Sequence, residues 1–192
     1  MDAGRTVAKV LLEAGHSSAI GLIGAAPPNR VPKDSLAAIQ RLQGITEALD
    51  AAGAEVAGAV ACPDWQPEIG YDATRRLLEK TRPSALICFN DRLALGAYQA
   101  LADAGLDVPG DVSVVSFDDD LMASWVRPQL TTVALPHYEL GRLAINVLLD
   151  EDRQPPTNGQ PTIYRVPMPL SERDSVRPLP SAKRRGRAAA LA

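Results

Sequence analysis

Short apolar runs alternate with longer segments of helical periodicity over the first 120 residues of the chain. Apolar runs predict strands at 19–23, 55–61, 85–89 and 112–117. Apolar residues that recur every three or four positions predict helices at 5–13, 36–52, 69–80 and 93–104. Because each of the first three strands is followed by a helix, the pattern predicts an α/β fold with a doubly wound, parallel, Rossmann-like sheet.

The rhythm changes after Asp120. Residues 121–129 have no clear period, and residues 130–135 are predicted to be extended. Residues 136–149 carry apolar side chains at helical spacing and predict an amphipathic helix. Residues 162–169 alternate between polar and apolar positions and are flanked by prolines, which is typical of a strand at the margin of a sheet.

Polar residues follow two of the predicted strands directly. Asn90 and Asp91 come after the strand at 85–89, and three aspartates at 118–120 come after the strand at 112–117. Ligands of open parallel sheets bind outside the carboxyl ends of the strands, so this edge is the predicted functional site. Asp91 itself is expected to do no more than cap the helix that follows it.

Composition sets the outer bounds of the interpretation. The chain has 192 residues, of which 46% are hydrophobic and 22% charged, as in an ordinary globular protein with one core. No apolar run approaches the roughly 20 residues that span a bilayer, and the first residues lack a secretory pattern, so a cytoplasmic protein with no membrane partner is expected. Cys62 and Cys88 are expected to be buried reduced thiols, with a disulfide as the alternative.

Charge is unevenly distributed along the chain. Residues 171–192 carry six basic and two acidic side chains, so their net charge is +4, and the total of −3 leaves −7 on the rest. An acidic body is a poor surface for nucleic acid. Residues 171–192 are predicted to be a disordered basic tail, whose residues 183–187 (KRRGR) could attract polyanions without sequence specificity.

Three linked motifs carry a resemblance to a known family. Residues 89–97 (FNDRLALGA), 108–119 (VPGDVSVVSFDD) and 128–133 (PQLTTV) resemble, in order and spacing, the effector-binding domain of the lactose/galactose repressor (LacI/GalR) family. The similarity covers roughly residues 2–170, and Ser116 departs from it because the family usually has glycine there.

The resemblance implies a periplasmic-binding-protein-like fold of type I, in which two Rossmann-like subdomains enclose a small ligand behind a helix-turn-helix. It implies that residues 1–170 are the C-terminal subdomain of such a sensor domain, so that the fold is incomplete. The helix at 136–149 would belong to the missing N-terminal subdomain. No helix-turn-helix pattern is evident, so operator DNA is expected to bind only through a segment missing here.

Four residues match the family's ligand-binding positions. Arg41 corresponds to an arginine that donates to ligand oxygens, and Trp65 to an aromatic residue that stacks on the ligand. Asn90 and Asp118 correspond to an amide and a carboxylate, which together could discriminate sugar hydroxyls or a purine edge. The expected partner is therefore a small sugar or a purine-like effector, with no catalytic residue, no metal and no cofactor.

The resemblance also implies a homodimer, because members of the family pair through this subdomain. Leu95 on the helix at 93–104, together with Trp125 and Val126, falls at the corresponding positions. All three are apolar where a monomer would favour polar residues.

Alternative functions fit the sequence less well. Asp118 and Asp120 resemble the paired aspartates of haloacid-dehalogenase-like phosphatases, but the expected later lysine and acidic metal ligands are not evident. The glycines at 21 and 24 lack dinucleotide-binding spacing. A sugar-binding protein of the periplasmic type remains an alternative, disfavoured by the missing signal pattern. The prediction is a sensor rather than an enzyme.

Overall fold

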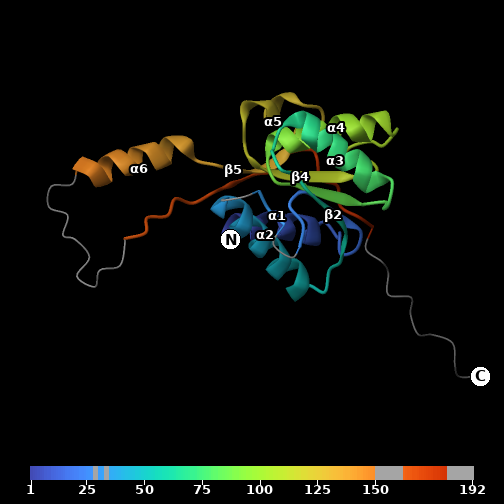
Figure 1. Cartoon of the computed structure of the whole chain (residues 1–192), viewed down its shortest axis with the longest axis horizontal. Helices are drawn as coiled ribbons and strands as arrows, with labels where there is room; N and C mark the ends of the chain where they lie inside the picture. Colours follow the sequence, from blue (N-terminus) through green and yellow to red (C-terminus); the bar gives the residue numbers. More distant parts are fainter. Residues whose placement is uncertain (28–29, 33–34, 150–161, 181–192) are drawn as a thin grey trace, which may run out of the picture.

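The computed structural model describes residues 1–27, 30–32, 35–149 and 162–180. Helices and strands alternate along most of this part of the chain (Figure 1). In order they are α1 (Asp2–Glu13), β1 (Ile20–Gly24), α2 (Leu36–Ala51), β2 (Val56–Ala61), α3 (Pro67–Leu78), β3 (Ala85–Cys88), α4 (Asp91–Asp103), β4 (Ser113–Asp118), α5 (Leu121–Trp125), β5 (Thr131–Ala134), α6 (His137–Leu149) and β6 (Leu170–Ser171).

These strands form one sheet in the order β2-β1-β3-β4-β5-β6. All neighbouring pairs are parallel except β5 and β6, which are antiparallel. Parallel pairing needs crossover connections, and the helices between the strands provide them. The predicted doubly wound α/β sheet is therefore confirmed.

Helices cover both faces of the sheet. Figure 1 shows α1 and α2 packed together on one face and α3 and α4 packed together on the other, as their contacts also indicate. The central strands β1 and β3 contain only buried residues, whereas the edge strand β2 is partly exposed. Phe89 and Phe117, at the carboxyl ends of β3 and β4, are the largest fully buried side chains.

A close approach between α1 and α2 fixes the position of α2 on the sheet. A Cβ atom added to Gly4 of α1 would lie 2.3 Å from the carbonyl oxygen of Arg41, and one added to Gly44 would lie 2.1 Å from the carbonyl oxygen of Met1. Real Cβ atoms essentially never approach backbone so closely, so glycine is required at both positions. This packing positions the helix that carries Arg41.

Two predictions for the second half of the chain were wrong in detail. Residues 121–125 form a short helix rather than irregular structure, and Asp120 caps it by accepting a hydrogen bond of 3.3 Å from the Met122 amide. Residues 162–169 form no strand. The edge strand begins only at Leu170, because that is where the chain reaches β5 and pairs with Val133.

Residues 170–180, here called the C-terminal strap, correct the prediction of a disordered tail beginning at 171. Ser175 is fully buried, where its Oγ donates to the Val114 carbonyl at 2.5 Å and accepts from the Thr131 amide at 2.8 Å. Further along, the Leu179 amide donates to the Ala14 carbonyl at 2.7 Å. Hydrogen bonds of backbone and hydroxyl groups hold the strap on the sheet. Because few of its residues are apolar, the sequence pattern did not predict that this segment is ordered. The basic cluster at 183–187 lies outside the described residues.

Helix α6 differs from the other long helices because none of its residues is buried. It extends away from the sheet and its covering helices (orange in Figure 1). Its exposed apolar side chains include Tyr138, Ile145, Leu148 and Leu149. The predicted amphipathic helix is confirmed, while its assignment to a second subdomain stays a prediction.

Both cysteines are buried and free, as predicted. Burial raises the pKa of the Cys62 thiol to about 11 and raises that of Cys88 further, so both stay protonated at neutral pH. Among the described residues, no helix has the length and apolar character needed to cross a membrane.

Candidate ligand-binding site

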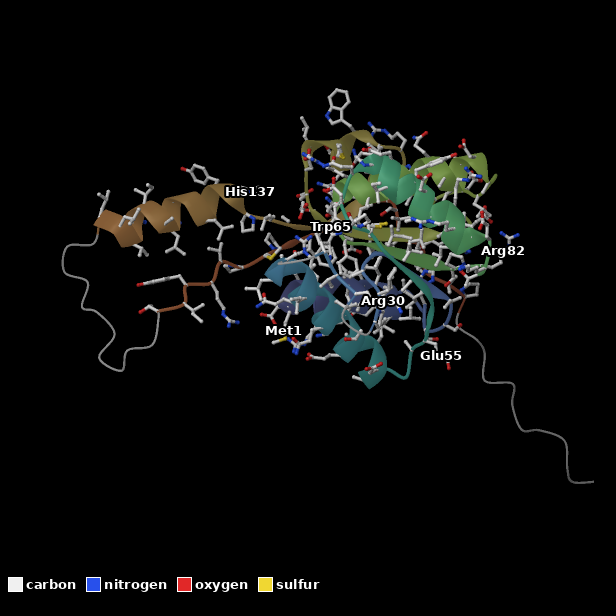
Figure 2. All side chains as sticks on the ribbon, in the orientation of Figure 1. Met1, Arg30, Glu55, Trp65, Arg82 and His137 are labelled. Atoms are coloured by element: carbon white, nitrogen blue, oxygen red, sulfur yellow. The ribbon has the colours of Figure 1, made fainter. Side chains whose placement is uncertain are left out.

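The four predicted ligand residues meet at the carboxyl edge of the sheet. Arg41 comes from α2, Trp65 from the loop before α3, Asn90 from the end of β3 and Asp118 from the end of β4. The Nη2 atom of Arg41 donates to Asp118 Oδ1 at 2.8 Å, and its Nη1 atom donates to the Phe89 carbonyl. Figure 2 labels Trp65 on the side of the molecule from which α6 extends.

Aromatic rings hold the Arg41 guanidinium in place. Its Cζ atom lies 4.5 Å from the centre of the Phe117 ring and 5.6 Å from that of Trp65. Trp65 in turn packs edge-on against Phe89, with ring centres 5.9 Å apart. Only 9% of the Arg41 side chain is exposed, so the guanidinium is oriented before any ligand arrives.

Asn90 has a structural role in addition to its predicted one. Its Oδ1 atom accepts from the Leu93 amide at 2.9 Å and caps α4, and its Nδ2 atom donates to the Trp65 carbonyl at 3.2 Å. The predicted cap, Asp91, was wrong: Asn90 occupies that position. One Nδ2 proton of Asn90 is left for another acceptor.

Asp91 is buried beneath the site, and the sequence did not reveal its role. Its Oδ1 atom accepts from the hydroxyls of Ser116 and Thr132, and its Oδ2 atom accepts from the Asp120 amide at 2.7 Å. Burial raises the pKa of Asp91 to about 6, and these three donors partly oppose the rise. Hydroxyls on two core strands, at Ser116 and Thr132, were the available signal, because buried hydroxyls need partners.

The turn that carries Asp118 has an uncommon backbone. Asp118 has φ of 111° and Asp119 has φ of 54°, both in the region that favours glycine. Such residues cost about 1–3 kcal/mol each and persist where the surroundings hold them. The Asp118 side chain is 29% exposed, and among the described residues only its Oδ1 atom is bonded, so Oδ2 can accept from a ligand.

The site therefore combines a paired cation and anion with an amide and an aromatic ring. Arg41 and Asp118 neutralise each other, while spare donors and acceptors remain on both and on Asn90. This arrangement can bind an uncharged molecule with several hydroxyl or amide groups. The described residues contain no group of three or more His, Cys, Asp or Glu side chains placed to hold a metal ion.

Comparison with known proteins identifies the class. Residues 8–176 match the model of the periplasmic binding protein-like domain, and the chain belongs to this family. The ribose operon repressor of Escherichia coli is 37% identical over 174 residues, which make up 90% of this chain and 50% of the repressor. The transcriptional repressor PurR of Haemophilus influenzae is 36% identical over 156 residues, which make up 78% of this chain and 43% of that protein.

Solved structures agree with these relatives. A dimeric lac repressor superposes with a TM-score of 0.80 at 29% identity, covering 93% of this chain and 62% of the repressor. A LacI-family regulator from Enterococcus faecium with bound ribose has a TM-score of 0.75 at 28% identity, covering 93% and 63%. The predicted resemblance to the effector-binding domain of LacI/GalR regulators is thus confirmed. The chain spans about half the length of the curated relatives it matches.

Proposed function

We propose that this chain is the effector-sensing portion of a LacI-type transcriptional regulator, and that Arg41, Trp65, Asn90 and Asp118 form one wall of its effector site. The observation that carries the proposal is the Arg41–Asp118 ion pair, held between Phe117 and Trp65 at the carboxyl edge of the sheet. A buried, oriented ion pair beside an aromatic face serves ligand recognition better than it serves stability, because buried pairs contribute little net stabilisation.

A sugar is the preferred effector and a purine the alternative. Adjacent hydroxyls can each accept from Arg41 or Asn90 and donate to Asp118, while an apolar ring face stacks on Trp65. A purine offers a ring edge to the same groups. The similarity to a ribose operon repressor supports the sugar class.

Binding to this chain alone is expected to be weak. Each hydrogen bond to a charged group contributes about 1.5–3 kcal/mol and a stacked ring about 1 kcal/mol, whereas association costs on the order of 4–15 kcal/mol. Because this chain supplies only one wall of a two-walled cleft, we expect a dissociation constant in the millimolar range or above.

Titration with a panel of monosaccharides and purine bases, followed by NMR of the labelled chain, tests this proposal. One class of ligand should perturb the resonances of Arg41, Trp65 and Asn90, and Asp118→Ala should abolish the effect. Arg5→Met is a matched control, because Arg5 also forms ion pairs, with Asp2 and Glu47, but on the exposed surface of α1. Absence of site-specific perturbation in the wild type would refute the proposal.

A homodimer is the second part of the proposal. Trp125 is 74% exposed on α5, and Leu95 lines a hollow of about 500 Å³ between α3 and α4. We propose that these residues and Val126 contribute apolar contacts to an interface with a second copy of the chain. Sedimentation of Leu95→Asp should show a weakened dimer, and Leu148→Asp, on exposed α6, should leave association unchanged. A monomeric wild type at high concentration would contradict this.

No catalytic role, metal or cofactor is proposed. Asp118 is paired with Arg41 and Asp120 caps α5, so neither matches a free phosphatase nucleophile. Phosphatase assays with magnesium test this directly, and turnover lost on Asp118→Asn would overturn it. Operator recognition and a cytoplasmic location are proposed for the regulator as a whole. This chain alone should show no protected operator sequence in footprinting.

A further inference from the structure

The turn that presents Asp118 is held by a segment distant in the sequence, and this inference rests on the proposed function. The Asp119 carboxylate has both oxygens engaged by the C-terminal strap. Its Oδ1 atom accepts from Arg173 Nη2 at 2.6 Å, and its Oδ2 atom accepts from Ser171 Oγ at 2.6 Å. The Arg173 side chain is 18% exposed and that of Asp119 is 22% exposed, so water competes little for this ion pair.

Arg173 is itself fixed in position. Its Nη1 atom donates to the Leu130 carbonyl at 2.8 Å, and its backbone amide donates to the Thr131 hydroxyl at 2.9 Å. Ser171 pairs with Thr132 in the sheet, and the buried Ser175 holds the strap further along. Asp119 is therefore bound by a rigid partner rather than by a freely rotating side chain.

Two ion pairs lie on either side of the end of β4. Asp118 is bonded to Arg41 on α2, and the next residue, Asp119, is bonded to Arg173 on the strap. Both residues have positive φ, which is costly, and backbone bonds help to hold them: the Leu135 amide donates to the Asp118 carbonyl at 3.0 Å, and the Asp119 amide donates to the Thr132 hydroxyl at 3.4 Å. The two ion pairs add side-chain restraints to these backbone bonds. Releasing Asp119 would let the turn relax and would change the direction of the Asp118 carboxylate.

We propose that Ser171 and Arg173 are positioning residues of the effector site, which hold Asp119 and thereby aim the Asp118 carboxylate at the ligand. The strap follows α6 in the chain. Effector affinity therefore depends on how firmly the strap is held against the sheet.

The test uses Arg173→Met, Asp119→Asn, the double variant and Arg173→Lys, with Arg5→Met as the control. Without ligand, the Asp118 amide and Arg41 side-chain Nε–H resonances should move in Arg173→Met and in Asp119→Asn, and stay in place in Arg5→Met. The ligand that perturbs the wild-type resonances should bind each single variant at least about fivefold more weakly than it binds the wild type. Fivefold is the smallest effect typical of energetic coupling between two sites. The double variant should be no weaker than either single one, and lysine should restore part of the affinity.

Melting temperature and protection of the Ser175 amide report whether the strap stays seated. Asp119→Asn keeps the backbone contacts of the strap and asparagine tolerates positive φ, so it remains informative if Arg173→Met releases the strap. If no ligand perturbs the wild type, the proposed function fails and the ligand-free resonances alone decide the positioning role. Unchanged Asp118 and Arg41 resonances in both single variants, or unchanged affinity, would overturn the inference.

Discussion

The two ends of the central sheet both contain buried polar groups, but they use them differently. At the amino end, His16 is fully buried, and its ring nitrogens lie 3.0 Å from Ser84 Oγ and 3.1 Å from Ser113 Oγ. The Nε2 atom also lies 3.3 Å from the Arg177 carbonyl, and burial lowers the pKa of His16, which favours the neutral ring. At the carboxyl end, charged Arg41 and Asp118 keep spare bonding capacity and a partly exposed carboxylate. Under the proposed function the carboxyl end serves recognition, whereas the amino end serves stability.

His16→Ala should give the largest loss of stability. Removing the ring leaves a buried cavity and takes one hydrogen bond each from Ser84 Oγ and Ser113 Oγ, so the free energy of unfolding should fall by about 2–4 kcal/mol. Ligand affinity should not change in the folded variant. Chemical denaturation measures the effect, and His137→Ala, at an exposed position of α6, is the matched control. An equal loss in both variants would remove the distinction between the two ends.

The pH dependence of stability should have opposite signs at the two ends. Burial lowers the pKa of His16 below 6.5, so the unfolded state binds the proton more readily, and stability is lost as pH falls below 6.5. Asp91 has its pKa raised from 3.8 to about 6, so the folded state binds the proton more readily. Its contribution is present below pH 3.8 and is lost as pH rises through about 6, by about 3 kcal/mol in total.

The Asp91→Asn variant should lose most of the change in unfolding free energy between pH 4 and 7 that arises from the carboxyl end of the sheet. The amide oxygen can still accept from the Asp120 amide, and the hydroxyls of Ser116 and Thr132 can rotate to accept from its nitrogen. Denaturation across this range measures the slope. Asp72→Asn, at an exposed position of α3, should leave the slope as it is in the wild type. A wild-type slope in Asp91→Asn would show that Asp91 does not titrate there.

Most of the fold was predictable because it follows from local periodicity. The predicted strands and helices up to Asp118 appear within a few residues of their expected ends. The four ligand residues also meet as the resemblance implied, because each follows a strand or lies on a helix whose position the sheet fixes. Their binding role remains a proposal.

The parts that were missed depend on contacts between distant segments. The strap is polar and rich in proline and arginine, which is typical of disorder, yet Ser175 reaches Val114 across 61 positions of sequence. Asp91 was predicted to cap α4 because Asn and Asp are both common N-cap residues, and the two stand side by side at the start of the helix. The structure shows that Asn90 is the cap. Sequence periodicity cannot show which of two neighbouring polar residues turns inward, since that depends on the hydroxyls of Ser116 and Thr132 on other strands.

Relief of backbone strain at the amino end should have the smallest effect on stability. Ala19, at the amino end, has φ of 63°, and no side-chain bond holds it there. Ala19→Gly should relieve this strain and stabilise the fold by about 1 kcal/mol, less the added flexibility of the unfolded chain. Thermal unfolding checks the sign. If Ala19→Gly is less stable than the wild type, the positive φ of Ala19 does not cost measurable free energy at this end of the sheet.

Fluorescence emission from Trp65 reports directly on whether a ligand binds beside Asp118. The chain has two tryptophans, and Trp125→Phe leaves Trp65 as the only one, in contact with the Arg41 guanidinium. A ligand that stacks on this ring beside Asp118 should cause a saturable change in emission at millimolar concentration, and Asp118→Ala should abolish it. Saturable binding seen by calorimetry with no change in Trp65 emission would place the ligand elsewhere and refute the proposed site.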